Sequence, residues 1–355
     1  MKEIKLLDIA KKAKVSPTTV SLVLNNKWQE LNISPSTQKR IIKIVEKFGY
    51  RPNILARGLK CGKTFLIGVV FSDITSGMEK IFKGIQSYFS NDGYEIILKI
   101  SNSNFKEWKE AIKYIIEKKV EGIIFESSFL YNPRIRKYIK EMEMSKKIKI
   151  VFIGNEIPGF ESPFIGNNNE EIGYIATKHL ISHGHKKIIC VTNTAYNNLI
   201  GILRVKGYKK ALKEANVKVN KEFIINFFPD KYGYFEGGYL AIKKFLAEKG
   251  KIFSAIFSHG DKTALGIIKG LQEIGFKIPE DVAIVSVDNE EFSNYVYPPL
   301  TTVNLDGFKL GKFAAQILHR LLQGEKVQSI LLTHKLIIRK SCGEHTNKVC
   351  SEINF

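Results

Sequence analysis

The sequence predicts an all-α headpiece followed by an α/β core of two doubly wound parallel sheets. From Phe65 onward, short apolar runs alternate with longer helical segments, which is the βα repetition that produces a parallel sheet with helical crossovers. Three short helical segments precede this repetition. Residues 1–63 carry fourteen Lys and Arg against four Asp and Glu, so half of the chain's formal charge of +20 lies there. This concentration indicates a polyanionic partner such as nucleic acid.

The first helical segment covers residues 6–13 (LLDIAKKA). Its apolar residues follow the i, i+3, i+4, i+7 spacing that places them on one face of a helix. They are Leu6, Ile9, Ala10 and Ala13. We therefore expect a short amphipathic helix that ends at a turn formed by Lys14 and Val15.

The second helical segment begins at Ser16 and Pro17. Ser16 can cap this helix, and Pro17 suits its first position because proline lacks the amide that would have no partner there. We expect Val20, Val23 and Leu24 on the inward side. The outward side and the amino-terminal end hold Pro17, Thr18, Thr19, Ser21 and Leu22. Small hydroxylated residues there can contact phosphates and base edges when a helix enters a DNA groove.

The third helical segment follows Ser34 and Pro35 and ends at residues 49–52 (GYRP). Its apolar positions are Ile41, Ile42, Ile44, Val45 and Phe48. Three helices of this kind also fit a simple small bundle. Their order and their basic charge favour a helix-turn-helix that binds DNA.

The core contains two series of alternating strands and helices, and two series of similar size predict two lobes with a cleft between them. Ligands of such sheets bind beyond the carboxyl ends of the strands. We expect strands at 65–72, 94–101, 122–126, 148–154, 187–192, 223–227, 252–258 and 283–287. We expect helices at 79–91, 108–119, 172–183, 205–215, 237–248 and 261–274.

Several classes of function find no support in the sequence. It has no glycine-rich phosphate loop, no paired metal ligands and no recognisable nucleophile triad, so we expect neither an enzyme nor a metal or other cofactor. The histidines at 179, 183 and 185 fit a helix end and its turn, and the four cysteines lie too far apart for a zinc site. No apolar run reaches the roughly 18 residues of a membrane span, and a signal peptide is lacking, which predicts a cytoplasmic protein without membrane contact.

Several segments resemble, in order, the lactose-repressor/galactose-repressor family of transcriptional regulators. In the headpiece these are DIAKKAKVSPTTVSLVLNN (8–26), SPSTQKRI (34–41), GYRPN (49–53) and ARGLKCGKT (56–64). In the core they are HLISHGHKKIICVT (179–192), RVKGYKKAL (204–212), GDKTALGIIKGLQEIGFKIPEDVAIVSVDN (260–289), PPLTTV (298–303) and LIIRKSCG (336–343). The resemblance implies a helix-turn-helix headpiece with a hinge helix, and a periplasmic-binding-protein-like core.

The resemblance also implies which headpiece residues bind double-stranded operator DNA. In that family the second helix lies in the major groove, so that Pro17, Thr18 and Leu22 face base edges while Thr19, Ser21 and Asn25 approach the backbone. Leu22 departs from the polar or basic residue common at this position and offers only apolar contact, for example to a thymine methyl. The full expected set is Ser16, Pro17, Thr18, Thr19, Ser21, Leu22, Asn25, Tyr50, Asn53, Arg57 and Leu59.

Residues 53–60 (NILARGLK) match the hinge helix of the family, which folds on the operator and inserts a leucine into the minor groove. By position that leucine is Leu59, whose insertion would unstack one base step and bend the duplex. Gly58 replaces a more usual serine and weakens a helix by about 1 kcal/mol. The alternative is an ordinary linker over residues 54–60.

By the same resemblance, Arg204 and Asp288 hold a small-molecule effector between the lobes, as a cation and an acid that can bind hydroxyls or polar ring atoms. The alternatives are that Arg204 caps a helix and that Asp288 forms an internal pair. Further candidates for the effector site are Asp73, Ser76, Asn155, His259, Asp261 and Tyr234. Of these, Asp261 could instead cap its helix, and Tyr234, like Tyr232, could serve packing rather than stack on a sugar.

These observations predict three domains. A helix-turn-helix covers 1–52, a hinge helix and linker cover 53–63, and an effector-binding and dimerisation core covers 64–355. In the core we expect an amino lobe at about 64–163 plus 295–325 and a carboxyl lobe at about 164–294 plus 326–342.

The predicted function is repression of carbohydrate-utilisation genes by a homodimer on a pseudo-palindromic operator, with release by a sugar-type effector. The alternative is a regulator that uses a phosphoprotein or a nucleobase-type corepressor. An exported sugar receptor would share the core but would need a signal peptide.

Overall fold

The computed structural model describes residues 4–24, 28–50, 62–73, 75–90, 92–101, 104–194 and 198–343. It divides into one unit of residues Met1–Leu66 with Lys119–Glu121 and a second unit that holds the rest of the chain. We call residues 4–50 of the first unit the headpiece and the second unit the core. Within the described ranges, no helix is long and apolar enough to cross a membrane.

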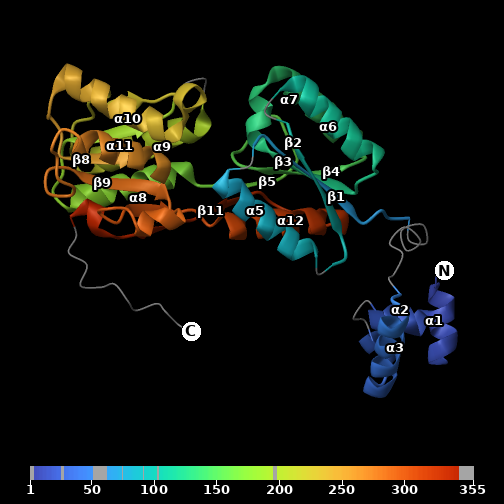
Figure 1. Cartoon of the computed structure of the whole chain (residues 1–355). Helices are drawn as coiled ribbons and strands as arrows, with labels where there is room; N and C mark the ends of the chain where they lie inside the picture. Colours follow the sequence, from blue (N-terminus) through green and yellow to red (C-terminus); the bar gives the residue numbers. More distant parts are fainter. Residues whose placement is uncertain are drawn as a thin grey trace. The chain divides into compact units, whose positions relative to one another are not determined.

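The headpiece is a bundle of three helices (Figure 1). Its elements are α1 (Leu6–Ala13), α2 (Pro17–Leu24), the 3-10 turn η1 (Trp28–Leu31) and α3 (Pro35–Phe48). Lys14 (φ 53°) and Gly49 (φ 60°) end α1 and α3 in the left-handed conformation that closes a helix. The buried centre consists of Ile9, Ala10, Ala13, Val20, Val23 and Ile41. Of the two neighbouring isoleucines of α3, Ile41 is buried, whereas Ile42 is 45% exposed.

The first sheet of the core has six strands in the order β11-β5-β4-β3-β1-β2 and defines the amino lobe. The strand pairs of defined register are parallel. Helices α5 and α12 cover one face and α6 and α7 the other (Figure 1). The strands are β1 (Leu66–Phe71), β2 (Glu95–Ile100), β3 (Gly122–Glu126), β4 (Lys149–Ile153), β5 (Phe164–Asn167) and β11 (Ile330–Leu332). The helices are α5 (Ser76–Phe89), α6 (Phe105–Glu117), α7 (Pro133–Ser145) and α12 (Gly307–Leu322).

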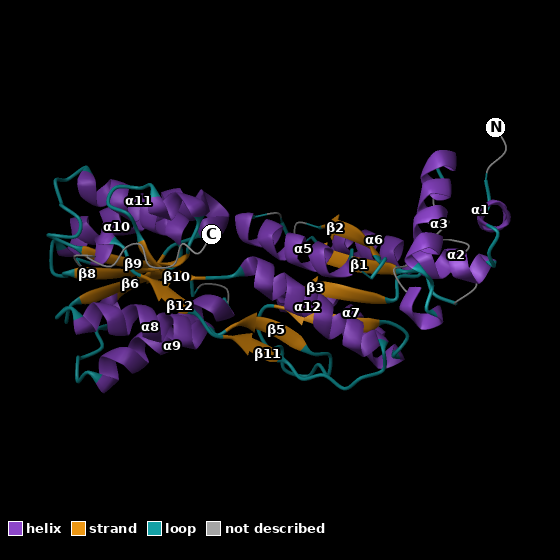
Figure 2. Ribbon diagram, turned by 90° about the horizontal axis from the view of Figure 1, so that it is seen from below, coloured by secondary structure: helices purple, strands orange, loops and turns teal. Residues whose placement is uncertain are grey.

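The second sheet also has six strands, in the order β12-β10-β9-β8-β6-β7, and defines the carboxyl lobe. All its strands are parallel except the antiparallel edge strand β12. Helices α8 and α9 cover one face and α10 and α11 the other (Figure 2). The strands are β6 (Ile188–Thr192), β7 (Ile224–Asn226), β8 (Ala255–Ser258), β9 (Ala283–Asp288), β10 (Thr301–Asn304) and β12 (Lys335–Ile337). The helices are α8 (Asn169–Ser182), α9 (Leu199–Glu214), α10 (Pro229–Lys249, broken at Gly233) and α11 (Asp261–Gln272).

The chain passes between the lobes three times, and this corrects the predicted lobe boundaries. β5 (164–167) and β11 (330–332) pair in the first sheet, whereas the prediction assigns both to the carboxyl lobe. β10 (301–304) pairs with β9 in the second sheet, whereas the prediction assigns it to the amino lobe. These strands are only three or four residues long. Such short segments show no periodicity, and their partners lie far away in the sequence.

Candidate nucleic-acid interface and effector cleft

The amino-terminal end of α2 presents hydroxyl groups to solvent. The side chains of Ser16, Pro17 and Thr18 are exposed, and those of Thr19, Ser21 and Leu22 are partly buried. The Thr19 amide donates to Ser16 Oγ at 3.1 Å, and the two hydroxyl oxygens lie 2.8 Å apart. Ser16 therefore caps α2, as the sequence predicts. The free amides of a helix amino terminus favour a phosphate group.

The hydrophobic centre of the headpiece determines which side of α2 faces outward. Val20 and Val23 are buried in it, and Leu24 packs against it. Leu22 lies at the border, because its side chain is only partly buried. A leucine there is available for apolar contact with a base edge.

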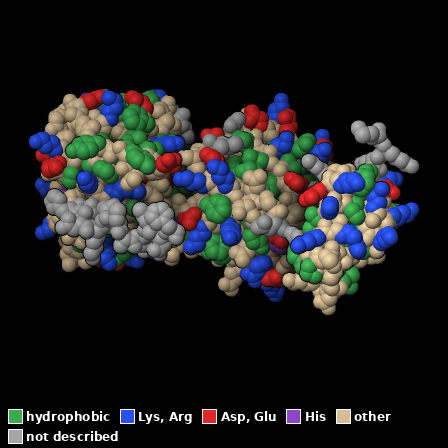
Figure 3. All heavy atoms as spheres, turned by 60° about the horizontal axis from the view of Figure 1, so that its bottom comes forward, with side chains coloured by type: hydrophobic (Ala, Val, Ile, Leu, Met, Phe, Trp, Pro, Cys, Tyr) green, Lys and Arg blue, Asp and Glu red, His purple; other side chains and the backbone are tan. Residues whose placement is uncertain are grey.

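Basic side chains surround this helix. Figure 3 shows Lys and Arg side chains over the surface of the headpiece. The exposed cations on α1, α3 and the turn after α1 are Lys11, Lys12, Lys14, Lys39, Arg40, Lys43 and Lys47. Positive charge at this density attracts the phosphate backbone of a nucleic acid.

Five predicted DNA contacts lie at the edge of the described residues or beyond it. Tyr50 is partly buried against the hydrophobic centre, and burial raises the pKa of its hydroxyl. Its ring has a packing role, and its DNA contact stays a prediction. The other four, Asn25, Asn53, Arg57 and Leu59, are outside the described residues, as is the predicted hinge helix.

In the core, a buried arginine connects the two lobes through asparagines. Arg204 of α9 is 5% exposed and donates through Nε to Asn169 Oδ1 at 3.1 Å. Asn169 Nδ2 in turn donates to Asn155 Oδ1 at 3.3 Å. Asn155 follows β4 of the amino lobe, and its amide donates to Ser127 Oγ at 3.0 Å. Arg204 also donates through Nη1 to the carbonyl of His259. It does not cap α9, because Asn198 does.

Asp288 lies at the carboxyl end of β9, beside the amino terminus of α11. The Asp261 amide donates to its carboxyl, and a Cβ placed on Gly260 would lie 2.7 Å from Asp288 Oδ2. Burial raises the pKa of Asp288 to about 7, although the nearby Arg204 opposes this shift. Among the described residues, neither an ion pair nor a hydrogen bond joins Asp288 to Arg204. A carboxyl of this kind can accept a ligand hydroxyl or, when protonated, donate to a ligand.

The backbone at Asp288 is strained. Asp288 has φ 111° and Asn289 has φ 55°, values that side chains other than glycine rarely adopt. Each such residue costs about 1–3 kcal/mol and persists only where its surroundings enforce it. Asn289 is fixed by Arg339 Nη2, which donates to its Oδ1 at 2.7 Å, and by its own Nδ2, which donates to Asn304 Oδ1 at 3.0 Å.

Asp261 holds the chain segment that follows Asp288. It is fully buried, and its carboxylate accepts from the Glu290 amide (2.9 Å), Ser293 Oγ (2.6 Å) and Thr302 Oγ1 (2.8 Å). The alternative that Asp261 caps α11 fails, because the N-cap residue is Gly260 and Asp261 is already the first residue of the helix. The contacts of Asp261 are internal, so its predicted role toward the effector stays a prediction.

Aromatic rings line the same end of the second sheet. The rings of His259 and Tyr234 are nearly parallel, with 14° between their planes and 6.5 Å between centroids. Phe227 packs edge-on against His259 at 5.4 Å. Burial and Arg204 hold the pKa of His259 well below its usual value, so the ring is neutral, and its Nδ1 lies 3.2 Å from Thr192 Oγ1. The side chain of Tyr234 is 46% exposed.

The remaining two candidates lie on the amino lobe. Asp73 is exposed after β1. Ser76, the first residue of α5, donates its hydroxyl to Glu290 rather than to Arg204 or Asp288. Three residues of this region, Asn169, Thr192 and Phe227, were not predicted from the sequence. Each lies at or just after the end of a strand, where ligands of parallel sheets bind, so examining the end of every strand would have identified them.

Comparisons with known proteins agree with this architecture. Residues 5–53 match bacterial regulatory proteins of the lacI family, and residues 177–342 match the periplasmic binding protein-like domain. The chain is 32% identical over 337 residues to the HTH-type transcriptional repressor PurR of Vibrio vulnificus, which covers 94% of this chain and 96% of that one. It is also 32% identical over 339 residues to catabolite control protein A of Priestia megaterium, covering 95% and 98%.

Two solved structures show the same fold. The transcription regulator CcpA of Lactococcus lactis is 28% identical, with a TM-score of 0.68 over 78% of this chain and 98% of that one. The lac repressor dimer bound to operator and the anti-inducer ONPF is 23% identical, with a TM-score of 0.73 over 96% and 99%. The relatives are regulators, which confirms the expectation that the protein is not an enzyme. The chain therefore belongs to the lacI family of bacterial regulatory proteins and is a DNA-binding transcriptional regulator.

Proposed function

We propose that the protein represses carbohydrate-utilisation genes as a homodimer on a pseudo-palindromic operator, and that a sugar-type molecule held by Arg204 and Asp288 releases it. The observation that supports the effector half is the buried Arg204, which is connected to Asn169 and Asn155 and interacts electrostatically with Asp288 without a direct hydrogen bond. A charged group that is largely removed from water is costly unless hydrogen bonds or an opposite charge compensate it, and a ligand that contacts both side chains would add to this compensation.

The DNA half of the proposal assigns residues 1–52 to operator reading and 53–63 to a hinge. The exposed amino terminus of α2 and the surrounding cations support it. Two copies are needed because a two-fold symmetric operator requires two reading helices. Leu59 is the proposed minor-groove wedge, and Leu22 the residue that sets an unusual operator preference.

A sugar suits the polar groups of the cleft. Neighbouring hydroxyls can be bound together by the fork of an arginine guanidinium and by an acidic side chain. Asn155 adds an amide from the amino lobe, and Tyr234 offers a ring face for the apolar side of a sugar. A ligand that contacts both lobes binds the closed arrangement more tightly than the open one, and this difference is what allows it to change DNA affinity.

A nucleobase-type corepressor is the second candidate. It is favoured by the nearly parallel rings of His259 and Tyr234, because aromatic rings in such an arrangement can also stack on a planar ligand. A base would also use Asp288, whose pKa of about 7 lets it either donate or accept.

A thermal-shift screen of the full chain against sugars, sugar phosphates and nucleobases tests the effector class. A ligand at one hundred times its Kd stabilises a protein by roughly 2.7 kcal/mol. We expect a sugar to raise the Tm, and we expect Arg204→Met to remove the shift. Stabilisation by nucleobases alone selects the second candidate. No shift with any small molecule, together with binding of a phosphorylated carrier protein, contradicts both.

A further inference from the structure

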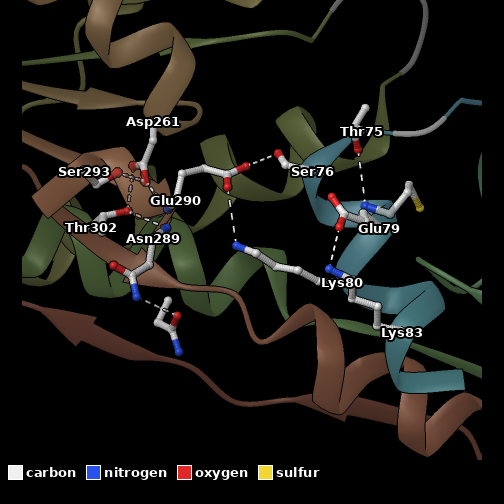
Figure 4. Close-up of polar contacts among 12 residues, drawn as sticks. Thr75, Ser76, Glu79, Lys80, Lys83, Asp261, Asn289, Glu290, Ser293 and Thr302 are labelled. Carbon is white, nitrogen blue, oxygen red and sulfur yellow. Dashed lines mark hydrogen bonds and ion pairs between the residues drawn. The ribbon is translucent and has the colours of Figure 1, made fainter. Parts of the chain in front are cut away.

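The segment that carries Asp288 continues directly to the other lobe. The Glu290 side chain is only 13% exposed and points away from the second sheet toward α5 of the amino lobe (Figure 4). Its Oε1 accepts from the Ser76 hydroxyl, and its Oε2 lies 3.4 Å from Lys80 Nζ. We call these two contacts of Glu290, with Ser76 and with Lys80, the latch.

Both sides of the latch are held firmly. On the carboxyl lobe, the Glu290 amide donates to the buried Asp261 carboxylate at 2.9 Å. On the amino lobe, Thr75 caps α5 by accepting from the Met78 amide at 3.4 Å, and Ser76 is the first residue of the helix. A carboxylate beside a helix amino terminus is stabilised by the helix dipole, in addition to its hydrogen bond and ion pair.

We propose that the latch couples the effector site to the arrangement of the lobes: a change at Asp288 is transmitted through Asn289 to Glu290 and makes or breaks its contacts with α5. This proposal rests on the proposed effector site at Asp288. Two consecutive residues with positive φ separate that carboxyl from Glu290, and a strained segment has a lower cost for switching to another backbone arrangement.

The surroundings of Glu290 leave room for this movement. A cavity of about 450 Å³ adjoins the latch and is lined by Ser76, Lys262, Glu290, Glu291, Phe292 and Tyr295. This depression is open to solvent, so the Glu290 side chain has space beside α5 into which it can turn. A packed core would resist such a movement.

The chain supplies matched controls for the latch. Glu79 and Lys83 form an ion pair of 2.5 Å within α5, so that pair has the same chemistry on the same helix but joins no lobes. Glu291 is the neighbour of Glu290 and is exposed. Replacing these residues changes the local charge equally and leaves the latch intact.

Amide hydrogen exchange on the full chain tests the latch without a ligand. We expect Glu290→Gln to raise the exchange rate of amides 79–81 in the first turns of α5 by roughly three- to tenfold, because a partly exposed charged hydrogen bond is lost. Glu291→Gln should leave the Glu290 contacts intact and the exchange of amides 79–81 unchanged. Unchanged exchange at 79–81 in Glu290→Gln, or an equal rise in Glu291→Gln, overturns the proposal.

A charge exchange separates the latch from general destabilisation. We expect Glu290→Lys to raise exchange at 79–81 and the double variant Lys80→Glu/Glu290→Lys to restore most of the protection, since the pair is remade in reverse. The matched charge swap Glu79→Lys/Lys83→Glu, introduced into Glu290→Lys, should not restore the protection of amides 79–81. If the double variant Lys80→Glu/Glu290→Lys does not restore the protection of amides 79–81, the proposed latch is wrong, even if the single variants unfold.

The coupling to Asp288 has its own measurement. We expect Asp288→Asn to raise the hydrogen-exchange rate of amides 79–81 in the otherwise unchanged protein. In the Glu290→Gln variant, the same substitution should cause no further rise. Additive effects overturn the coupling. This result is independent of the proposed function, because it is obtained without effector or DNA, and the effector proposal fails separately if no ligand shifts the Tm.

Discussion

The two lobes of the core have the same architecture but differ in where their buried polar groups lie. Each has a six-stranded sheet with two helices on either face. Among the described residues, the buried polar side chains of the amino lobe are neutral, namely Ser101, Ser127 and Asn155. The carboxyl lobe buries charged groups, among them Arg204 and Asp261. On the proposed effector site, we therefore expect the carboxyl lobe to supply most of the ligand-binding energy.

The largest effect expected from this difference is a pH dependence that belongs to the carboxyl lobe. The pKa of Asp288 is raised from 3.8 to about 7, so the folded state binds more protons than the unfolded state between these values. The free energy of unfolding should fall as pH rises from about 4 to about 7, by up to about 4 kcal/mol. Urea unfolding at several pH values measures this. Asp288→Asn should flatten the dependence, and an unchanged slope in that variant would place its origin elsewhere.

Substitutions of the two connected residues Arg204 and Asn155 compare the lobes directly. Arg204→Met should weaken ligand binding by roughly a hundredfold, because a charged hydrogen-bonding group is lost from a buried site. Asn155→Ala should weaken it by roughly fivefold, because a neutral group is lost. Calorimetric titration with the ligand found in the thermal-shift screen gives both numbers. A larger loss in Asn155→Ala would reverse the comparison between the lobes.

The same glycine substitution in each lobe should have different consequences. In Gly260→Ala the new methyl would lie 2.7 Å from Asp288 Oδ2 and should displace the carboxyl, weakening ligand binding by roughly tenfold. In Gly77→Ala of the amino lobe, the nearest atom would be Thr75 Oγ1 at 3.9 Å, and binding should stay within twofold. Equal affinities for the two variants would show that the position of Asp288 is not critical.

The local features of the headpiece were predictable from the sequence. The spacing of Ile9, Ala10 and Ala13 gives the buried face of α1, and the Ser-Pro pairs give the starts of α2 and α3. The two neighbouring isoleucines Ile41 and Ile42 do not reveal from sequence which one faces the bundle; Ile41 is buried and Ile42 is 45% exposed. Only the packing of α3 against the other helices decides this.

The cleft was less predictable. Arg204 and Asp288 follow from the family resemblance, but the connection through Asn169 depends on how α8 and α9 pack. Glu290 escaped notice because its partners Ser76 and Lys80 are more than 200 residues away in the sequence. The predicted lobe was wrong for the strands at 164–167, 301–304 and 330–332 for the same reason. The sheet to which each of these short strands belongs is decided by pairing with strands far away in the sequence.

In the proposed function, a ligand held by Arg204 and Asp288 controls binding to DNA. The most direct test is fluorescence anisotropy of the full-length protein on a duplex selected from a random pool, at fixed salt, with and without the ligand. We predict that the ligand raises the Kd for the duplex at least tenfold in the wild-type protein and leaves it unchanged in Arg204→Met. A duplex affinity that ignores the ligand, or that responds equally in Arg204→Met, would contradict the claim.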